Sequence, residues 1–134
     1  MGGAVTDGSP LEDLDYAYLT TTGRRSGRPH RIEIWFALVD GVVFFLSGGG
    51  DRSDWVRNLV SPEVVVELGN ERRTRPARVV TDGNEDRLAR AALVSKYTPR
   101  YRGDLEEWGR TSLPIAVDWT ERTDATAEER TRGP

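Results

Sequence analysis

The sequence predicts an α+β fold, an antiparallel β-barrel of about six strands with short flanking helices. Three features support this prediction. Polar and apolar residues alternate along 31–39, as they do in a half-buried strand. Asp40 and Gly41 follow at once, and this pair favours a type I′ hairpin turn, which needs positive φ at both central positions. The glycine-rich segment 47–50 lacks the GxGxxG spacing and the long crossover helix of a dinucleotide-binding parallel sheet.

The first half of the chain reads as a helical turn followed by strands. The turn at 11–16 leads into a strand at 18–22, and strands at 31–39 and 42–46 form the hairpin. Successive side chains of a strand point to opposite faces, so one face of the second strand should carry its apolar residues, Ile32, Ile34, Phe36 and Leu38. Of the adjacent aromatic residues Trp35 and Phe36, we expect one in the core and the other facing a pocket or a partner subunit.

Short strands and helices alternate in the second half. A short helix at 55–60, capped by Ser53 or Asp54, must end before Pro62. Strands at 63–68 and 75–81 follow, with Gly69 and Asn70 turning the first of them.

A longer helix begins after the second of these strands. Asp82 or Asn84 caps it, and Thr98-Pro99 stops it. A helical turn at 104–110 and a last strand at 113–119 complete the fold. The buried face of the longer helix should carry its apolar residues, Leu88, Ala91, Ala92, Leu93 and Tyr97.

Length and composition indicate one globular domain, which we place at 11–120 of the 134 residues. The termini 1–10 and 121–134 are polar and small, and we expect them to be flexible. The chain has no cysteine and one histidine, so we expect no disulfide and no metal site. It shows no signal-peptide pattern and no apolar run near the roughly 18 residues of a membrane span, which favours a cytoplasmic protein.

The most informative segment is 19–31, LTTTGRRSGRPHR, which we call the arginine loop. Four arginines, at 24, 25, 28 and 31, lie around two glycines and a proline. Arginine binds phosphate oxygens in pairs, and glycine lets backbone N–H groups approach them. The net charge of the chain is −3, so this positive charge is local and favours a discrete anionic ligand over nucleic acid. The alternative is a charged β-turn without a ligand.

A second loop has a similar character. Ser47, Gly48, Gly49 and Gly50 end a strand, and Asp51 and Arg52 lead into a helix. Free N–H groups at a helix start, together with an arginine, can bind phosphate. The alternative is a flexible connector. Because the two loops lie at the two ends of the predicted hairpin, they could face a single ligand.

Candidates for acid–base chemistry are few. Tyr97 and Tyr101 could donate protons, with packing against a helix end as the alternative. His30 lies inside the arginine loop. The four tryptophans suggest binding of a flat ring. If the protein is an enzyme, a cofactor should therefore supply the chemistry.

The arginine loop, from Leu19 to Pro29, resembles the signature of the deazaflavin-dependent nitroreductases, also called F420-dependent quinone reductases. The resemblance covers about 16–119 and includes further motifs in the same order, at 33–36, 47–50, 55–59, 61–63, 77–78 and 108–114. Family members often have a lysine at the position of Gly48. The resemblance implies a split β-barrel related to FMN-binding oxidases of the pyridoxamine-phosphate type.

The resemblance also implies a cofactor, reduced coenzyme F420, with FMN as the alternative. Its phosphate and polyglutamate tail would lie on the arginine loop, at Arg24, Arg25, Ser26, Gly27, Arg28 and Pro29. The second loop, Ser47 to Gly50 with Arg52, would line the phosphate region of the deazaflavin. Trp35, Trp55 and Asn58 would lie near the ring or its linker.

The reaction that the resemblance implies is hydride transfer to a small acceptor, namely a quinone, a nitroaromatic compound or an enone. Tyr97 or Tyr101 would then be the catalytic proton donor. An FMN-dependent oxidase, or a non-catalytic carrier of a cofactor or lipid, is the alternative function. Pairing into a homodimer is a further expectation.

Overall fold

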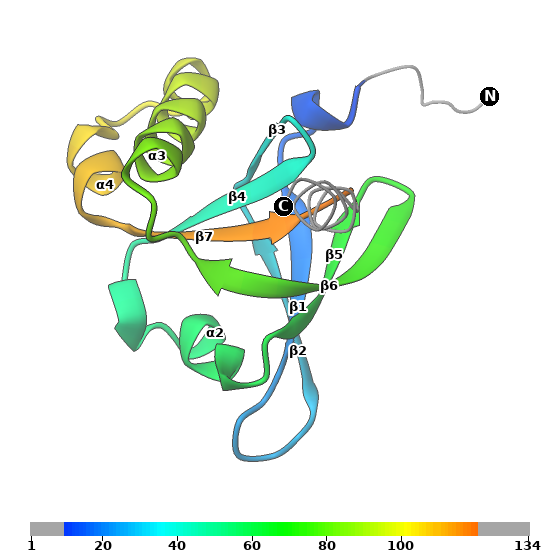
Figure 1. The fold of residues 1–134 in the computed structure, drawn as a ribbon. Helices are drawn as coiled ribbons and strands as arrows, with labels where there is room; N and C mark the ends of the chain where they lie inside the picture. Colours follow the sequence, from blue (N-terminus) through cyan, green and yellow to red (C-terminus); the bar gives the residue numbers. More distant parts are fainter. Residues whose placement is uncertain (1–9, 121–134) are drawn as a thin grey trace, which may run out of the picture.

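The computed structural model describes residues 10–120, so the predicted flexibility of 1–9 and 121–134 lies outside the described residues. A 3-10 turn, η1 (Leu11–Asp13), precedes one seven-stranded antiparallel sheet in the order β2-β1-β5-β6-β7-β4-β3. The strands are β1 (Ala17–Thr22), β2 (Pro29–Ile34), β3 (Ala37–Val39), β4 (Val42–Ser47), β5 (Glu63–Leu68), β6 (Glu71–Val79) and β7 (Leu113–Asp118). The sheet curls strongly (Figure 1), which confirms the α+β split-barrel prediction.

The segment 31–39 is not one strand, and this prediction is wrong. β2 pairs with β1, whereas β3 pairs with β4, so the two halves of the segment lie at opposite ends of the sheet order. This division raises the number of strands from the expected six to seven. The predicted apolar face is nevertheless confirmed, because Phe36 is buried in one core and Ile32, Ile34 and Leu38 pack against the same core. The curl of the sheet lets both halves cover that core.

The predicted turns are confirmed by the backbone. Asp40 and Gly41 both have positive φ, 51° and 80°, as a type I′ hairpin between β3 and β4 requires. Gly69 also has positive φ, at the connection between β5 and β6. The local sequence was sufficient for these turns because only glycine and a few polar residues adopt this conformation easily.

The long helix α3 (Gly83–Tyr97) begins at Asp82, whose carboxylate accepts a hydrogen bond from the Glu85 N–H at 2.9 Å. Of the two caps considered, Asp82 is therefore confirmed. The buried face of α3 consists of Ala89, Leu93 and Tyr97. Leu88 is 43% exposed, so the predicted face is rotated slightly from the true one. Only contact with the sheet decides which of two adjacent apolar residues is buried.

The remaining helices are short. The helix predicted at 55–60 is divided into α2 (Asp54–Arg57) and η3 (Asn58–Val60), and η2 (Gly50–Arg52) precedes them. After α3 come η4 (Thr98–Arg100) and α4 (Glu106–Thr111). Figure 1 shows α3 and α4 side by side, and α2 at the opposite end of the sheet. No helix in the described part of the chain is long and apolar enough to cross a membrane.

The sheet separates two apolar clusters. The side chains of β4 alternate between them, with Val43 and Phe45 in the barrel core and Phe44 and Leu46 under the helices. Leu93 and Tyr97 bring α3 into the second cluster. Both faces of β4 are therefore buried, which explains its continuous apolar sequence.

Side chains at the end of α3 provide hydrogen-bond partners for the backbone at the break between β2 and β3. The Phe36 N–H donates to the Tyr97 hydroxyl at 3.1 Å, and Lys96 Nζ donates to the Phe36 carbonyl at 3.1 Å. Lys96 Nζ also lies 3.7 Å from the centre of the Phe36 ring. Because buried backbone groups need partners, these contacts make the break possible.

The Lys96 ammonium predicts a pH dependence of stability. Burial, and secondarily the charge of Arg100, lowers the pKa of Lys96 from 10.5 to about 8. The unfolded chain keeps the ordinary pKa, so it binds the extra proton between these two values, and folding stability should rise with pH across this window. Because the side chain is partly exposed, we expect a rise of only about 1 kcal/mol. Urea unfolding of the wild type at both ends of the window should show the rise, and Lys96→Met should lack it.

Candidate functional site

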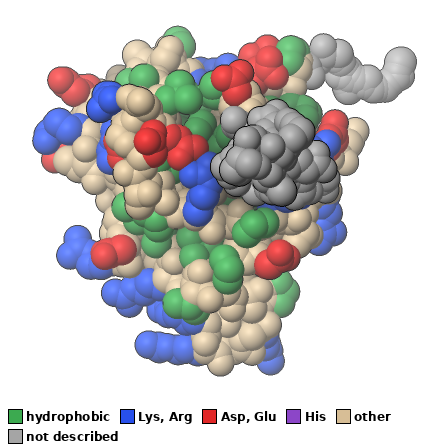
Figure 2. Space-filling model, viewed as in Figure 1, with side chains coloured by type: hydrophobic (Ala, Val, Ile, Leu, Met, Phe, Trp, Pro, Cys, Tyr) green, Lys and Arg blue, Asp and Glu red, His purple; other side chains and the backbone are tan. Residues whose placement is uncertain are grey.

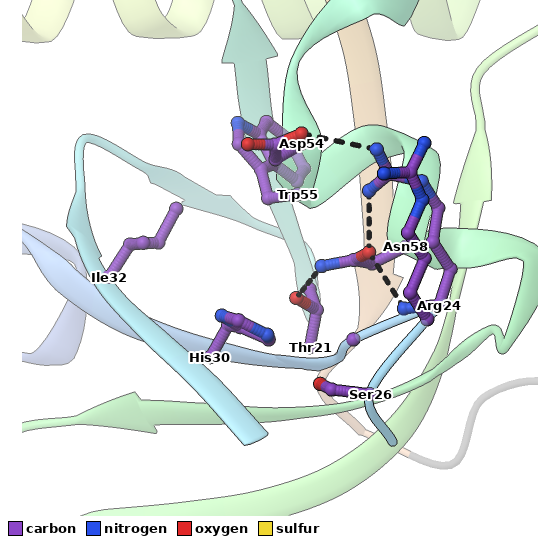
Figure 3. Close-up of a pocket in the computed structure, with 10 residues that line it drawn as sticks. Thr21, Arg24, Ser26, His30, Ile32, Asp54, Trp55 and Asn58 are labelled. Carbon is purple, nitrogen blue, oxygen red and sulfur yellow. Dashed lines mark hydrogen bonds and ion pairs between the residues drawn. The ribbon is translucent and has the colours of Figure 1, made fainter. Parts of the chain in front are cut away.

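A pocket of about 450 Å³ lies between the arginine loop and α2 (Figure 3). We call it the arginine pocket. The loop between β1 and β2 contributes Arg24, Arg25 and Ser26, and the α2–η3 segment contributes Trp55 and Asn58. The other lining residues are Thr21, Gly23, His30, Ile32 and Asp54. Five of the predicted cofactor-binding residues therefore come together in one cavity.

The arginine loop folds back on itself. The Gly23 N–H donates to the Arg28 carbonyl at 2.8 Å, and the Gly27 N–H donates to the Gly23 carbonyl at 2.9 Å. The Ser26 hydroxyl accepts from the Arg28 N–H at 3.1 Å. A Cβ at Gly23 would lie 2.6 Å from Nε2 of His30. A larger residue there would therefore have to displace the side chains of His30 and Ser26.

Asn58 joins the arginine loop to the helical side of the pocket. Its Oδ1 accepts from the Arg24 backbone N–H at 3.1 Å and from the Arg24 guanidinium at 2.9 Å. Its Nδ2 donates to the Thr21 hydroxyl at 3.1 Å. Figure 3 shows these three bonds converging on one amide. The Asn58 amide therefore positions Arg24 and ties the arginine loop to β1.

Replacing Asn58 by leucine should therefore destabilise the fold. Asn58 is only 4% exposed and Thr21 is buried, so the substitution leaves buried polar groups without partners. We expect the free energy of unfolding to fall by about 2–3 kcal/mol. Urea denaturation measures this change. Asn84→Leu, at an exposed position of α3, should change stability by no more than about 0.5 kcal/mol. Equal effects of the two substitutions would contradict the role of Asn58.

The positive charge of the pocket is only partly neutralised. Arg24 pairs with Asp54 at 3.2 Å, and that carboxylate is largely exposed. The side chains of Arg25 and Arg28 have no hydrogen-bond or ion-pair partner within residues 10–120. Lys and Arg side chains gather at the lower end of the molecule in Figure 2, where the arginine loop and α2 lie. The arrangement suits an anion.

The second loop lies elsewhere. None of the lining residues of the arginine pocket belongs to Ser47–Gly50 or Arg52. The Ser47 hydroxyl donates to the Gly50 carbonyl at 2.9 Å and contacts the Ser53 hydroxyl at 2.8 Å. A Cβ at Gly48 would come within 3.5 Å of the Trp108 ring. The glycine loop therefore holds the start of α2 in place and borders α4, and it does not line the arginine pocket.

A second pocket, of about 410 Å³, lies at the opposite end of β2 and under α4. We call it the aromatic pocket. Trp35, Tyr101 and Trp108 line it, and the Trp35 ring meets each of the other two edge-on at 5.5 Å. Ile34 lines this pocket and Ile32 lines the arginine pocket, so the two cavities follow one another along β2. The expectation that one of the two adjacent aromatic residues lies in the core and the other faces a pocket is confirmed: Phe36 is buried and Trp35 lines the aromatic pocket.

The two predicted proton donors lie in different environments. Tyr101 is 48% exposed and lines the aromatic pocket. Tyr97 is 1% exposed, and its hydroxyl accepts from Phe36 and lies 2.7 Å from the Asp15 carbonyl. Burial raises the pKa of Tyr97. Its ring stacks on Trp35 at 4.2 Å, almost parallel. Tyr97 thus supports the wall of the pocket, and its placement gives no support to a proton-donating role.

Comparison with known families identifies the chain. Residues 1–120 match the profile of the F420H(2)-dependent quinone reductases. The chain belongs to this family. It is therefore an oxidoreductase that depends on F420, as the resemblance of the arginine loop implied.

Solved structures show the same fold at low sequence identity. A structure of an F420-H2 dependent reductase is 24% identical, with a TM-score of 0.62, over 82% of this chain and 99% of the other. A structure described as a domain-swapped dimer is also 24% identical, with a TM-score of 0.63, over 84% and 87% of the two chains. An FAD-binding protein from Mesorhizobium loti is 17% identical, with a TM-score of 0.56, over 82% and 84%.

The arginine pocket fits the cofactor of this F420-dependent family. Arg24 and Arg25 supply positive charge for a phosphorylated molecule. The side chain of Arg24 is held by Asn58, and that of Arg25 has no partner in the described chain. Trp55 and Ile32 supply apolar surface for a ring or its linker. When bound, reduced F420 supplies a hydride. The protein's part is to bind and orient it.

Several pocket residues were missing from the predicted site, namely Thr21, Gly23, His30, Ile32 and Asp54. Most of them adjoin predicted residues in the sequence. Asp54 directly precedes Trp55, and its carboxylate pairs with Arg24. An arginine-rich loop is a reason to search for such a carboxylate. Thr21 carried no such signal, because its role depends on Asn58, 37 residues away.

Proposed function

We propose that the protein transfers a hydride from reduced F420 to a quinone, a nitroaromatic compound or an enone. The observation that carries this proposal is the arginine pocket, in which guanidinium groups and an indole ring line one cavity. A cofactor with a charged, phosphorylated tail and a flat ring needs both kinds of surface.

Within this proposal the arginine loop binds the tail. Arg24 and Arg25 contact the phosphate, and Ser26, Gly27 and Pro29 shape the loop around it. Arg28 and Arg52 are exposed and have no side-chain partner in the described chain, so they can bind further carboxylates of the tail. Arg24 is held in place beforehand by Asn58, which lowers the entropy lost on binding.

The acceptor would bind in the aromatic pocket. Trp35, held by the stacked ring of Tyr97, presents a fixed flat surface to it. Tyr101 is the accessible hydroxyl of this pocket and is our candidate for the proton donor to acceptors that need one. Because residue 48 is glycine, no side chain at this position covers the edge of Trp108.

Pairing into a homodimer stays a prediction.

Side-by-side titration of F420 and FMN tests the cofactor. We expect F420 to bind with a change in its fluorescence and FMN to bind more weakly. Steady-state assays with the reduced cofactor and one acceptor of each class then test turnover. Tight binding of FMN without binding of F420 at high micromolar concentration would overturn the proposal. Binding of F420 without turnover of any acceptor would instead favour a carrier.

A further inference from the structure

The two pockets differ in charge. The arginine pocket is lined by two guanidinium groups, those of Arg24 and Arg25, and by a single carboxylate, that of Asp54. The aromatic pocket is lined by two carboxylates, Glu33 and Asp104, and by no lysine, arginine or histidine among the described residues. An anionic ligand is therefore favoured in the first pocket and disfavoured in the second.

We propose that the aromatic pocket binds a flat, electron-poor ring that carries a positive charge. Tyr101 and Trp108 each lie nearly perpendicular to Trp35, at 80° and 89°, so three aromatic rings in different orientations line the pocket and can offer negative π-faces to a cationic ring. The Trp35 ring cannot easily turn away, because Tyr97 stacks on it and is itself bonded to the backbone. The site is therefore formed before the ligand arrives.

The two carboxylates remain available to such a ligand. Glu33 Oε1 accepts from the Tyr18 hydroxyl at 3.2 Å, and Asp104 Oδ1 accepts from the Glu106 N–H at 2.9 Å. These bonds hold both groups in place without neutralising them. Neither carboxylate forms an ion pair within residues 10–120. The nearest arginine on the same strand as Glu33, Arg31, is already paired with Glu67 at 2.8 Å.

A cationic acceptor also needs no proton donor in the aromatic pocket. A cationic ring that accepts a hydride becomes a neutral dihydro ring and takes up no proton. Both electrons and the hydrogen come from the reduced deazaflavin, which is oxidised and releases its remaining proton to water. This part of the inference rests on the proposed function, whereas binding of the cation does not.

The test compares two probes with the same ring system, 10-methylacridinium and uncharged acridine, in mildly alkaline buffer without F420. Quenching of tryptophan fluorescence follows binding. We expect the cation to bind roughly three- to tenfold more tightly than acridine, by an amount that shrinks as salt is added. The double variant Glu33→Gln, Asp104→Asn keeps both hydrogen bonds and the aromatic rings, so it should reduce this preference and its salt dependence while leaving acridine binding unchanged.

The matched control is Glu63→Gln, an exposed carboxylate of β5 outside the pocket. It changes the net charge in the same direction and should leave the preference intact. Equal affinity for the two probes, or loss of the preference in the control, would overturn the inference. Trp35→Leu should weaken both probes, and unchanged affinity would place the binding elsewhere.

A second arm adds reduced F420 and follows its oxidation by 10-methylacridinium. Oxidation that the double variant slows would support the cation as an acceptor. If the cation binds with the expected preference but is not reduced, and neutral acceptors are not reduced either, the proposed function fails while the binding site stands. If only neutral acceptors are reduced, the proposed function stands and the cation is excluded as an acceptor.

Discussion

Replacing Tyr97 by alanine should lower the free energy of unfolding by about 3–5 kcal/mol, the range for removing a fully buried aromatic ring. The ring is 1% exposed and packs against Trp35. The hydroxyl also closes the break between β2 and β3 through the Phe36 N–H. The substitution therefore creates a cavity and leaves a buried donor without a partner. Urea denaturation followed by far-UV circular dichroism measures the loss.

Two further variants separate these contributions. Tyr97→Phe keeps the ring and removes the hydroxyl, so it should cost about 1–3 kcal/mol. Tyr101→Ala is the matched control, because that ring is 48% exposed, and it should have a much smaller effect on stability. If Tyr97→Ala and Tyr101→Ala are equally stable, the core position of Tyr97 is wrong. If Tyr97→Phe alone abolishes turnover at full stability, the proton-donor prediction is restored.

Replacing Arg24 or Arg25 by alanine should weaken the binding of F420 by about 1.5–3 kcal/mol each, or roughly ten- to a hundredfold, because each removes a charge-assisted hydrogen bond. Both residues line the arginine pocket. Arg24→Lys keeps the charge but loses the fork that reaches Asn58 and Asp54, so we expect an intermediate affinity. Fluorescence titration measures these affinities at one fixed salt concentration.

Arg110→Ala is the control for general charge effects. Arg110 is exposed on α4 and lines neither pocket. It removes the same charge, so it should leave the affinity for F420 almost unchanged. An equal loss in this variant would mean that the cofactor is attracted by the overall field of the protein and that the arginine loop is not its binding site.

Much of the fold could be predicted because the signals are local. The hairpin at Asp40 and Gly41 follows from the φ angles that the turn demands, and the start of α3 follows from the Asp82 carboxylate beside a free N–H. Alternation along 31–39 correctly grouped the apolar residues on one core. The break at Trp35 and Phe36 left no local signal, because extended backbone continues on both sides of it.

The candidate site shows the same contrast. Arginine and glycine in one short loop predicted an anion site, since the chemistry lies in adjacent residues. The second loop was less informative, because its glycines could suit phosphate, a turn or contact with Trp108 equally well, and it does not line the arginine pocket. Asn58 was predicted to lie near the ring or linker of the cofactor, and the structure shows it positioning Arg24 from 34 residues away.

The sequence by itself determined the family, the arginine loop and the antiparallel barrel, because each depends on residue types and on spacings within a few residues. The tertiary structure alone decided that Tyr97 is a core residue stacked on Trp35, and that Asn58 holds Arg24 by hydrogen bonds. It also decided that the charged and aromatic residues form two pockets of opposite charge. These features depend on contacts between distant segments, which the curl of the sheet and the packing of α3 bring together.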